Sequence, residues 1–481
     1  MASIKKNFAY SSILTVSTYI FPLITYPYVS RVLGVYNVGV CNFVDSIINY
    51  FILFSMMGMQ IMAIREIANT HGDKGKQSTV FSSLFLLNLI TTVVALVTLF
   101  ILIQVIPKLH EYKYMMYIGM AKILFNSLLI EWYYKGIENF QYITFRSLIV
   151  KCLYVILVFT LVKSSEDYYV YYFITVLVVI INALINILYS RHLVDFSFRK
   201  IDFKPYIHSF FILGFYLFLT SMYTSFNTAY LGFISGEIEV GYYSTAVKLY
   251  SVILGIFSAF TGVMLPRMSS LLAEGNRSEF MRLTNKSLDV LLCFSLPLIM
   301  YSIVFAPQLV RLISGPGYEG AIIPMRIVMP LMLIIGYEQV LIVQILTPLE
   351  KDKALFINSS IGAVVGLVLN LMIVHRLGAI GSSIVWVFSE VSVLCSAQYF
   401  VSKYLSYDLP LKRTTICVLT YLPAALLFLI ISRTFSGVLA PLLVGFIILL
   451  IYTFLVECFI LKNTVVRDSF YSILSVIKKK K

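Results

Sequence analysis

The sequence predicts an all-α integral membrane protein, and three observations support this: the composition, the length of the apolar runs and the distribution of positive charge. Of the 481 residues, 59% are hydrophobic and only 12% are charged, and the mean hydropathy is +0.89. A soluble domain does not need so apolar a chain to fill its core. The apolar runs are roughly 20 residues or longer, the length at which a helix crosses a hydrocarbon core. A transmembrane barrel would instead show short alternating strands.

The apolar runs predict about fourteen transmembrane helices. They lie near residues 8–30, 37–62, 78–106, 114–134, 141–163, 168–190, 206–234, 240–266, 286–306, 322–347, 354–375, 379–402, 414–432 and 438–461. With a cytoplasmic N-terminus, about 26 lysines and arginines fall on the inner segments and about 8 on the outer ones. We therefore expect both termini in the cytoplasm. The first run has no convincing cleavage site, so we expect a retained first helix.

An internal sequence repeat predicts two related lobes. The stretch Tyr26–Arg65 has a second copy 202 positions later, in which Gly39, Met62 and Arg65 fall on Gly241, Met264 and Arg267. Transporters built from two related halves bind the substrate between them. We expect an N-terminal lobe of helices 1–6 at residues 1–200 and a C-terminal lobe of helices 7–12 at 201–405, around a central cavity. Residues 406–481 would supply helices 13 and 14 and a basic cytoplasmic tail.

Charged residues inside the predicted spans are the candidate functional residues. An ionised side chain at mid-membrane costs about 2.5–3.5 kcal/mol on insertion scales, so it needs a partner or a polar surrounding. The deep cations are Lys122, Lys151 and Lys248, with Arg31 near the outer end of helix 1; Asp45, Glu338 and Glu390 are candidates for ion or proton coupling. Two interpretations remain open for each lysine: a binding role, or a structural ion pair with an acid such as Asp45 or Glu131.

Several classes of function have no support in the sequence. There is no phosphate-binding Gly-Lys-Ser/Thr loop and no cluster with metal-ligand spacing. The six cysteines contain no C-x-x-C pair, so we expect buried thiols. The net charge of +14 is explained by topology and headgroup attraction, not by nucleic acid. We expect no enzyme, no cofactor and no metal site.

Two regions resemble the bacterial polysaccharide exporters, the Wzx-type flippases of lipid-linked oligosaccharides. The first contains Trp132, Gly136, Glu138, Arg146, Lys151, Asp167, Tyr168 and Tyr171, and it departs from the family pattern at Lys135, where glutamine is more usual. The second contains Gly362, Asn370, Leu377, Gly378, Ala379, Gly381 and Glu390 at matching spacing. The resemblance covers most of the chain. It implies membership of the superfamily that includes multidrug exporters and the lipid II flippase.

The resemblance also implies a function. We expect a flippase that moves an oligosaccharide repeat unit, linked through pyrophosphate to undecaprenol or a similar polyprenol, from the inner to the outer leaflet of the bacterial inner membrane. The product would serve O-antigen or capsule assembly, with a polymerase and chain-length proteins as partners. Cations would neutralise the pyrophosphate in an alternating-access cavity. The alternatives are a cation-coupled multidrug exporter, which should line its cavity with carboxylates, and a membrane polymerase, which should show a large outer loop.

Overall fold

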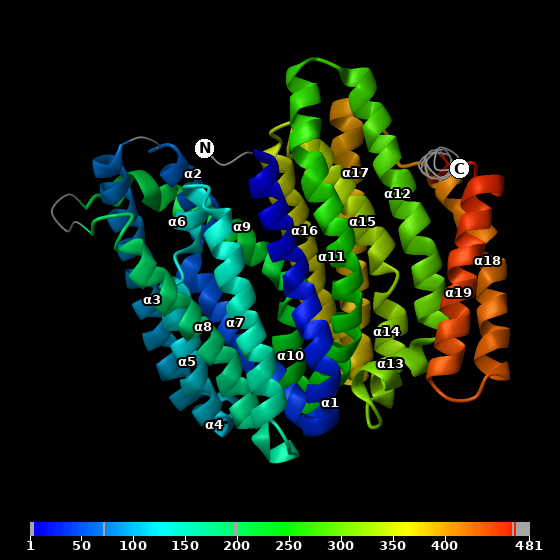
Figure 1. Ribbon diagram of the computed structural model, residues 1–481, viewed down its shortest axis with the longest axis horizontal. Coiled ribbons are helices and arrows are strands. Elements are labelled where there is room, and N and C mark those ends of the chain that lie inside the picture. Colours follow the sequence, from blue (N-terminus) through cyan, green and yellow to red (C-terminus); the bar gives the residue numbers. More distant parts are fainter. Residues whose placement is uncertain (1–3, 71–72, 197–200, 464–465, 468–481) are drawn as a thin grey trace, which may run out of the picture. The chain divides into compact units, whose positions relative to one another are not determined.

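The computed structural model describes residues 4–70, 73–196, 201–463 and 466–467, and these residues form helices and connecting turns without a strand (Figure 1). Most of the predicted basic tail, at 468–481, lies outside the described residues. The chain divides into two compact units, Met1–Ser244 and Thr245–Lys481. Each unit is described by itself. The all-α membrane fold predicted from the sequence is confirmed.

The first unit contains eleven helical segments and the start of another among its described residues. They are α1 (Ile4–Met56), α2 (Met59–Ala68), α3 (Lys74–Val105), α4 (Pro107–Glu111), α5 (Lys113–Ser127), α6 (Glu131–Gly136), α7 (Phe140–Leu161), a 3-10 turn (Ser165–Asp167), α8 (Tyr168–Ser190), α9 (Lys204–Thr224), α10 (Phe226–Ile234) and α11 (Glu237–Ala273). Helix α1 packs against α3, α5 and α7. Trp132 and Tyr133 are fully buried, and their rings lie 5.5 and 5.0 Å from that of Phe81. This aromatic contact anchors the short helix α6 against α3.

The second unit continues with α12 (Arg277–Val304), α13 (Ala306–Ser314), a 3-10 turn (Glu319–Ala321), α14 (Ile322–Val328), α15 (Leu331–Leu341), α16 (Asp352–Leu369), α17 (His375–Leu405), α18 (Leu411–Thr434) and α19 (Leu439–Leu455). Single π-helical turns follow α15, α16 and α19, at Ile342–Leu346, Asn370–Val374 and Val456–Ile460. Helices α18 and α19, orange and red in Figure 1, pack together and against α12. They occupy the predicted positions of helices 13 and 14. Their contact is aromatic and aliphatic, with Tyr301, Phe305 and Phe428 at its centre.

Two helices are interrupted by a glycine that no other residue type would replace without strain. Gly34 within α1 has φ 75° and ψ 169°, and Gly378 within α17 has φ 52° and ψ −129°. Positive φ combined with extended ψ is essentially restricted to glycine. A straight helix of 53 residues, the length of α1, would be about 80 Å long, against a hydrocarbon core of about 30 Å. Each of these runs therefore consists of two helices that meet at the glycine, as the separate predicted spans require.

Eleven helices in the described part of the chain are long and apolar enough to cross a membrane, and two of these, Ala9–Ala68 and Asp352–Leu405, contain 60 and 54 residues. The count of fourteen spans stays a prediction. The boundary between the compact units falls at Ser244, inside α11, whereas the predicted lobes meet at residue 200. Compactness does not test an internal duplication, so the assignment of two six-helix lobes also stays a prediction.

Candidate functional site

The seven candidate residues divide between the two units. The first unit holds Arg31, Asp45, Lys122 and Lys151, and the second holds Lys248, Glu338 and Glu390. The structure brings two pairs of them together, one in each unit.

Lys122 and Asp45 form an ion pair in the first unit. Lys122 extends from α5 and Asp45 from α1, and Nζ of the lysine donates to Oδ1 of the aspartate. Asn49, one turn after Asp45, donates to its second oxygen at 3.1 Å. The side chains are 15% and 33% exposed, respectively. Of the two interpretations left open by the sequence, the structure contains the ion pair, and the two charges cancel.

Lys151 has a different surrounding. It is half-buried on α7, and its Nζ donates to Oγ of Ser17 on α1 at 2.7 Å. Among the described residues no carboxylate lies within ion-pair distance of it. Glu131 and Arg146 are near enough to act on its charge. Lys151 is thus a cation oriented by a neutral hydroxyl group, with no carboxylate in direct contact.

Arg146 is a buried charge that was not among the candidate residues. Only 6% of the residue is exposed, and Nη2 lies 2.6 Å from Oε1 of Glu131. Its Nε and Nη1 are buried and have no hydrogen-bond partner within the described residues. Lys135 approaches the same carboxylate at 3.8 Å. With Lys151, this region has three cations for one carboxylate, and we call Glu131, Lys135, Arg146 and Lys151 the α6–α7 charge cluster.

The signal for Arg146 was present in the sequence. It lies inside the predicted span 141–163, where a charge has to be paired, and Glu131 lies at the end of the preceding run. The rule that selected Asp45, namely that a charge inside a span needs a partner, would also have selected Arg146.

Arg31 lies three residues before the glycine that interrupts α1. Its side chain is exposed, and Nη1 donates to the carbonyl oxygen of Pro27 at 2.7 Å. That places it at the end of the first apolar run, as predicted. Lys248 is partly buried on α11.

Glu338 and Glu390 form the pair in the second unit. Glu390 on α17 is 2% exposed and accepts a hydrogen bond from the indole of Trp386 at 2.9 Å. Its carboxyl group interacts with that of Glu338 on α15. Oε2 of Glu338 is buried and has no hydrogen-bond partner in the described structure. Two carboxyl groups in contact are suited to hold a proton or a cation between them.

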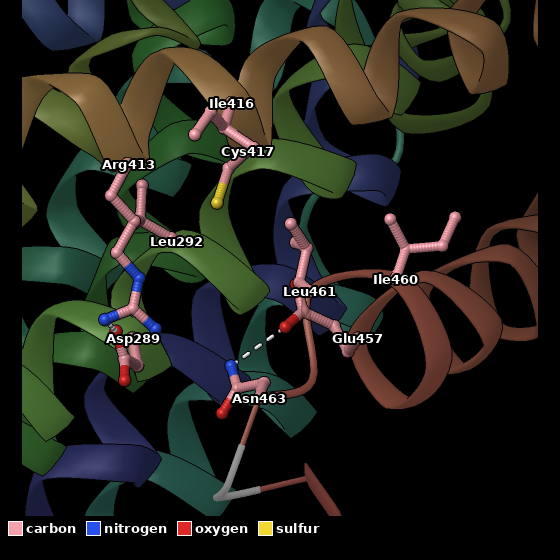
Figure 2. Close-up of a pocket in the computed structure, with 9 residues that line it drawn as sticks. All are labelled: Asp289, Leu292, Arg413, Ile416, Cys417, Glu457, Ile460, Leu461 and Asn463. Atoms are coloured by element: carbon pink, nitrogen blue, oxygen red, sulfur yellow. Dashed lines mark hydrogen bonds and ion pairs between the residues drawn. The ribbon is translucent and has the colours of Figure 1, made fainter.

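A further polar group in the second unit was not anticipated. Asp289 on α12 pairs with Arg413 on α18, with Oδ1 and Nη1 2.6 Å apart. Glu457, in the turn that follows α19, accepts hydrogen bonds from Tyr421 and Asn463, both at 2.8 Å. A cavity of about 260 Å³ is lined by Asp289, Arg413, Glu457 and Asn463, among others (Figure 2). Asp289 and Glu457 lie inside predicted spans, so the cost of a charge in the membrane could have identified them.

The described residues contain no group of three or more histidine, cysteine, aspartate or glutamate side chains able to hold a metal ion. The contacts in these clusters are ion pairs and hydrogen bonds.

Solved structures share this fold. The lipid II flippase MurJ in an inward closed conformation superposes with a TM-score of 0.77 at 16% identity, covering 93% of this chain and 98% of that one. A multidrug resistance transporter of the MATE family, of the MOP superfamily and in an inward-facing conformation, gives a TM-score of 0.63 at 16% identity, covering 82% and 98%. The chain therefore shares the fold of these two transporters.

Two curated relatives match in sequence. A protein of Escherichia coli (strain K12) named "Putative O-antigen transporter" is 25% identical over 72% of this chain and 83% of its own length. A protein of the same name from Shigella dysenteriae is 23% identical over 81% and 98%. Both names describe a transporter and not an enzyme, in agreement with the expectation from the sequence. The family model described as "Polysaccharide biosynthesis protein" matches residues 4–272. That match covers more than half of the chain, which therefore belongs to the polysaccharide biosynthesis protein family.

Proposed function

We propose that this protein is a flippase for a polyprenyl-pyrophosphate-linked oligosaccharide, which it moves from the cytoplasmic to the outer leaflet of the bacterial inner membrane. The family, the two relatives named as O-antigen transporters and the fold shared with a lipid II flippase support this proposal. On the outer leaflet, the repeat unit would be available to a polymerase. Both termini would lie in the cytoplasm, as the distribution of lysine and arginine favours.

The observation that carries the proposal is the α6–α7 charge cluster. Among the described residues, its three cations are grouped with one carboxylate, Glu131, so the cluster has an excess of positive charge. Buried charge is costly unless it is compensated. A pyrophosphate supplies the compensating negative charge and several oxygen atoms. The guanidinium of Arg146 and the ammonium of Lys151 both bind phosphate oxygens well.

The ion pair between Lys122 and Asp45 reduces the number of cations that we propose for substrate binding. Because the aspartate already neutralises this lysine, we assign Lys122 a structural role and keep Lys151 as the principal phosphate-binding lysine. Arg31 and Lys248 remain candidates for substrate binding. Among the acids, Glu338 and Glu390 are the better candidates for coupling, since Asp45 is occupied by its lysine.

A second candidate function, export of organic cations with proton or ion coupling, is favoured by one observation. The contact between Glu338 and Glu390 is a carboxylate pair of the kind that such an exporter would need. The charge cluster in the first unit argues against it, because an excess of positive charge repels a cationic drug.

The test measures export and folding separately. Lys151→Gln should reduce surface glycan at least about tenfold in cells whose glycan export depends on this protein, the size expected when about 1.4 kcal/mol of substrate binding is lost. The thermal unfolding temperature of the purified protein should remain unchanged. Lys353→Gln is the matched control, because Lys353 is exposed at the start of α16. Normal glycan export by a folded Lys151→Gln protein would refute the phosphate-binding role.

Reconstitution distinguishes the two functions. Proteoliposomes with a labelled lipid-linked oligosaccharide should expose the sugar to an added glycosidase when the wild-type protein is present. Dye efflux from the same vesicles that is abolished by Glu338→Gln, without any movement of the oligosaccharide, would favour the multidrug exporter instead.

A further inference from the structure

The cavity between α12, α18 and the end of α19 has the composition of a site for a small zwitterion. Figure 2 shows Arg413 reaching from α18 towards Asp289, and Asn463 beside Glu457. One guanidinium and two carboxylates line the same space. If all three are ionised, the cavity carries an excess of one negative charge.

The two carboxylates are both buried, but their polar contacts differ. Glu457 is 2% exposed, and its two carboxylate oxygens accept hydrogen bonds from neutral donors, the hydroxyl of Tyr421 and the amide of Asn463. Asp289 is 9% exposed, and its Oδ1, although close to Arg413, is buried without an aligned hydrogen bond. Buried acids in such surroundings gain from an additional cation that can donate hydrogen bonds. An ammonium group has this chemistry.

The guanidinium remains available on its other side. The Arg413 side chain is 46% exposed, whereas the Asp289 side chain that it contacts is 11% exposed. A guanidinium has five N–H donors in a planar fork, so one contact with a carboxylate leaves donors for an anionic group such as a phosphate diester.

The cavity lies at the ends of two candidate membrane spans. Arg413 is the third residue of α18, and Glu457 is three residues from the end of the candidate span Leu439–Ile460. The end of a span meets the headgroup layer of the bilayer. Ile416 and Ile460, which also line the cavity, are 47% and 63% exposed, so apolar side chains flank it on the surface that acyl chains would contact.

We propose that this cavity binds the headgroup of an aminophospholipid of the phosphatidylethanolamine type. The primary ammonium lies between Asp289 and Glu457, and the phosphate contacts Arg413. This site is separate from the α6–α7 charge cluster and does not depend on the proposed transport function. An anionic headgroup without an amine would bring its phosphate to Arg413 but would supply no cation for Glu457.

The experiment compares lipids of identical acyl chains retained by the purified protein. The protein in detergent is incubated with an equimolar mixture of phosphatidylethanolamine and phosphatidylglycerol, and the bound lipids are counted by native mass spectrometry. The wild-type protein should retain phosphatidylethanolamine at least fivefold over phosphatidylglycerol. Glu457→Gln and Arg413→Gln should each bring the ratio to within twofold of one. Arg433→Gln, at an exposed position at the other end of α18, is the matched control and should keep the wild-type ratio.

A second comparison needs no variant, so it decides the matter even if a substitution prevents folding. Phosphatidylcholine carries the same phosphate, but its quaternary ammonium has no N–H to donate. The wild-type protein should therefore retain at least fivefold more phosphatidylethanolamine than phosphatidylcholine. Equal retention of the two, preferential retention of the anionic lipid, or an unchanged ratio in a folded Glu457→Gln protein would overturn the proposal.

Discussion

Gly39 of α1 and Gly241 of α11 lie at one helix crossing, and their contacts are reciprocal. Gly39 lies against the backbone of Glu237, and Gly241 lies against the backbone of Val35. Val35 and Glu237 are each four residues before the respective glycine, and both pairs of positions are separated by 202 residues. A contact in which each partner touches the same position on the other is characteristic of a two-fold axis. The internal duplication predicted from the sequence would place equivalent residues at such a crossing.

The first prediction is that both glycines are required at this crossing. A methyl group on Gly39 would collide with the carbonyl oxygen of Glu237, and one on Gly241 would collide with that of Val35. Overpacking of this kind costs typically about 1–3 kcal/mol. Gly39→Ala and Gly241→Ala should each lower the thermal unfolding temperature of the purified protein by several degrees.

Gly262 on α11 provides the control. It is exposed, and a methyl group there would meet no atom within 4 Å. Gly262→Ala should leave the unfolding temperature unchanged or raise it, because alanine is favoured over glycine in a helix by about 1 kcal/mol. If Gly39→Ala and Gly262→Ala behaved alike, the close crossing would not exist in the folded protein.

The second prediction separates the two cations around Glu131. Removing Arg146 deprives the carboxylate of a buried partner at 2.6 Å, while removing Lys135 deprives it of a half-exposed partner at 3.8 Å. We expect Arg146→Gln to cost about 3–5 kcal/mol, as is typical of broken buried pairs. Lys135→Gln should cost no more than about 1 kcal/mol. Arg146→Lys should recover only part of the loss, because lysine cannot form the planar fork. Unfolding of the three variants in one detergent measures all of these, and equal losses for Arg146→Gln and Lys135→Gln would contradict the structure.

The third prediction concerns alkaline pH. Burial by itself would lower the pKa of Lys108, but its ion pair with Glu237, at 2.5 Å, and the nearby carboxylate of Glu111 together more than offset this and raise the pKa above its usual value of 10.5. A lysine with a raised pKa contributes stability below its unfolded pKa and loses that contribution as the pH rises through the folded value. The wild-type unfolding temperature should therefore fall more steeply above about pH 10.5 than that of Lys108→Arg, since arginine stays charged there. Parallel pH profiles for the two proteins would show that this ion pair contributes nothing.

The sequence determined the helices well because an apolar run ends where a helix leaves the membrane. The predicted span 78–106 corresponds to α3 at Lys74–Val105, and the span 438–461 to Leu439–Ile460. The prediction was less accurate for the span 114–134, which the structure divides into α5 and α6. The division includes Ile130, whose φ is 42°, a conformation that a β-branched residue rarely adopts. No local sequence pattern indicates this break in the helix. The contact that stabilises it joins Trp132 to Phe81, which is distant in the sequence.

The candidate site was harder to predict than the fold. The sequence shows, for Lys122 and Asp45 each by itself, that a charged residue lies inside a predicted span. Their pairing is a contact between two helices, and the two residues are 77 positions apart in the chain. The sequence offered both Asp45 and Glu131 as partners, and helix packing decides between them. Lys151 was identified by its depth, whereas its contact with Ser17 depends on the rotation of α7 against α1. Composition and periodicity do not determine that rotation.

The final prediction tests whether the charge of Lys122 is structural. Lys122→Gln leaves Asp45 with Asn49 as its remaining hydrogen-bond donor among the contacts described here. Because a third of the Asp45 side chain is exposed, the loss should be smaller than for a fully buried pair, about 1–3 kcal/mol. Asp45→Asn combined with Lys122→Gln removes both charges and should restore most of this stability. The doubly substituted protein should also export glycan normally, since the pair carries no net charge for the substrate to meet, whereas Lys151→Gln should not. A stable double variant that fails to export glycan would show instead that Lys122 acts on the substrate.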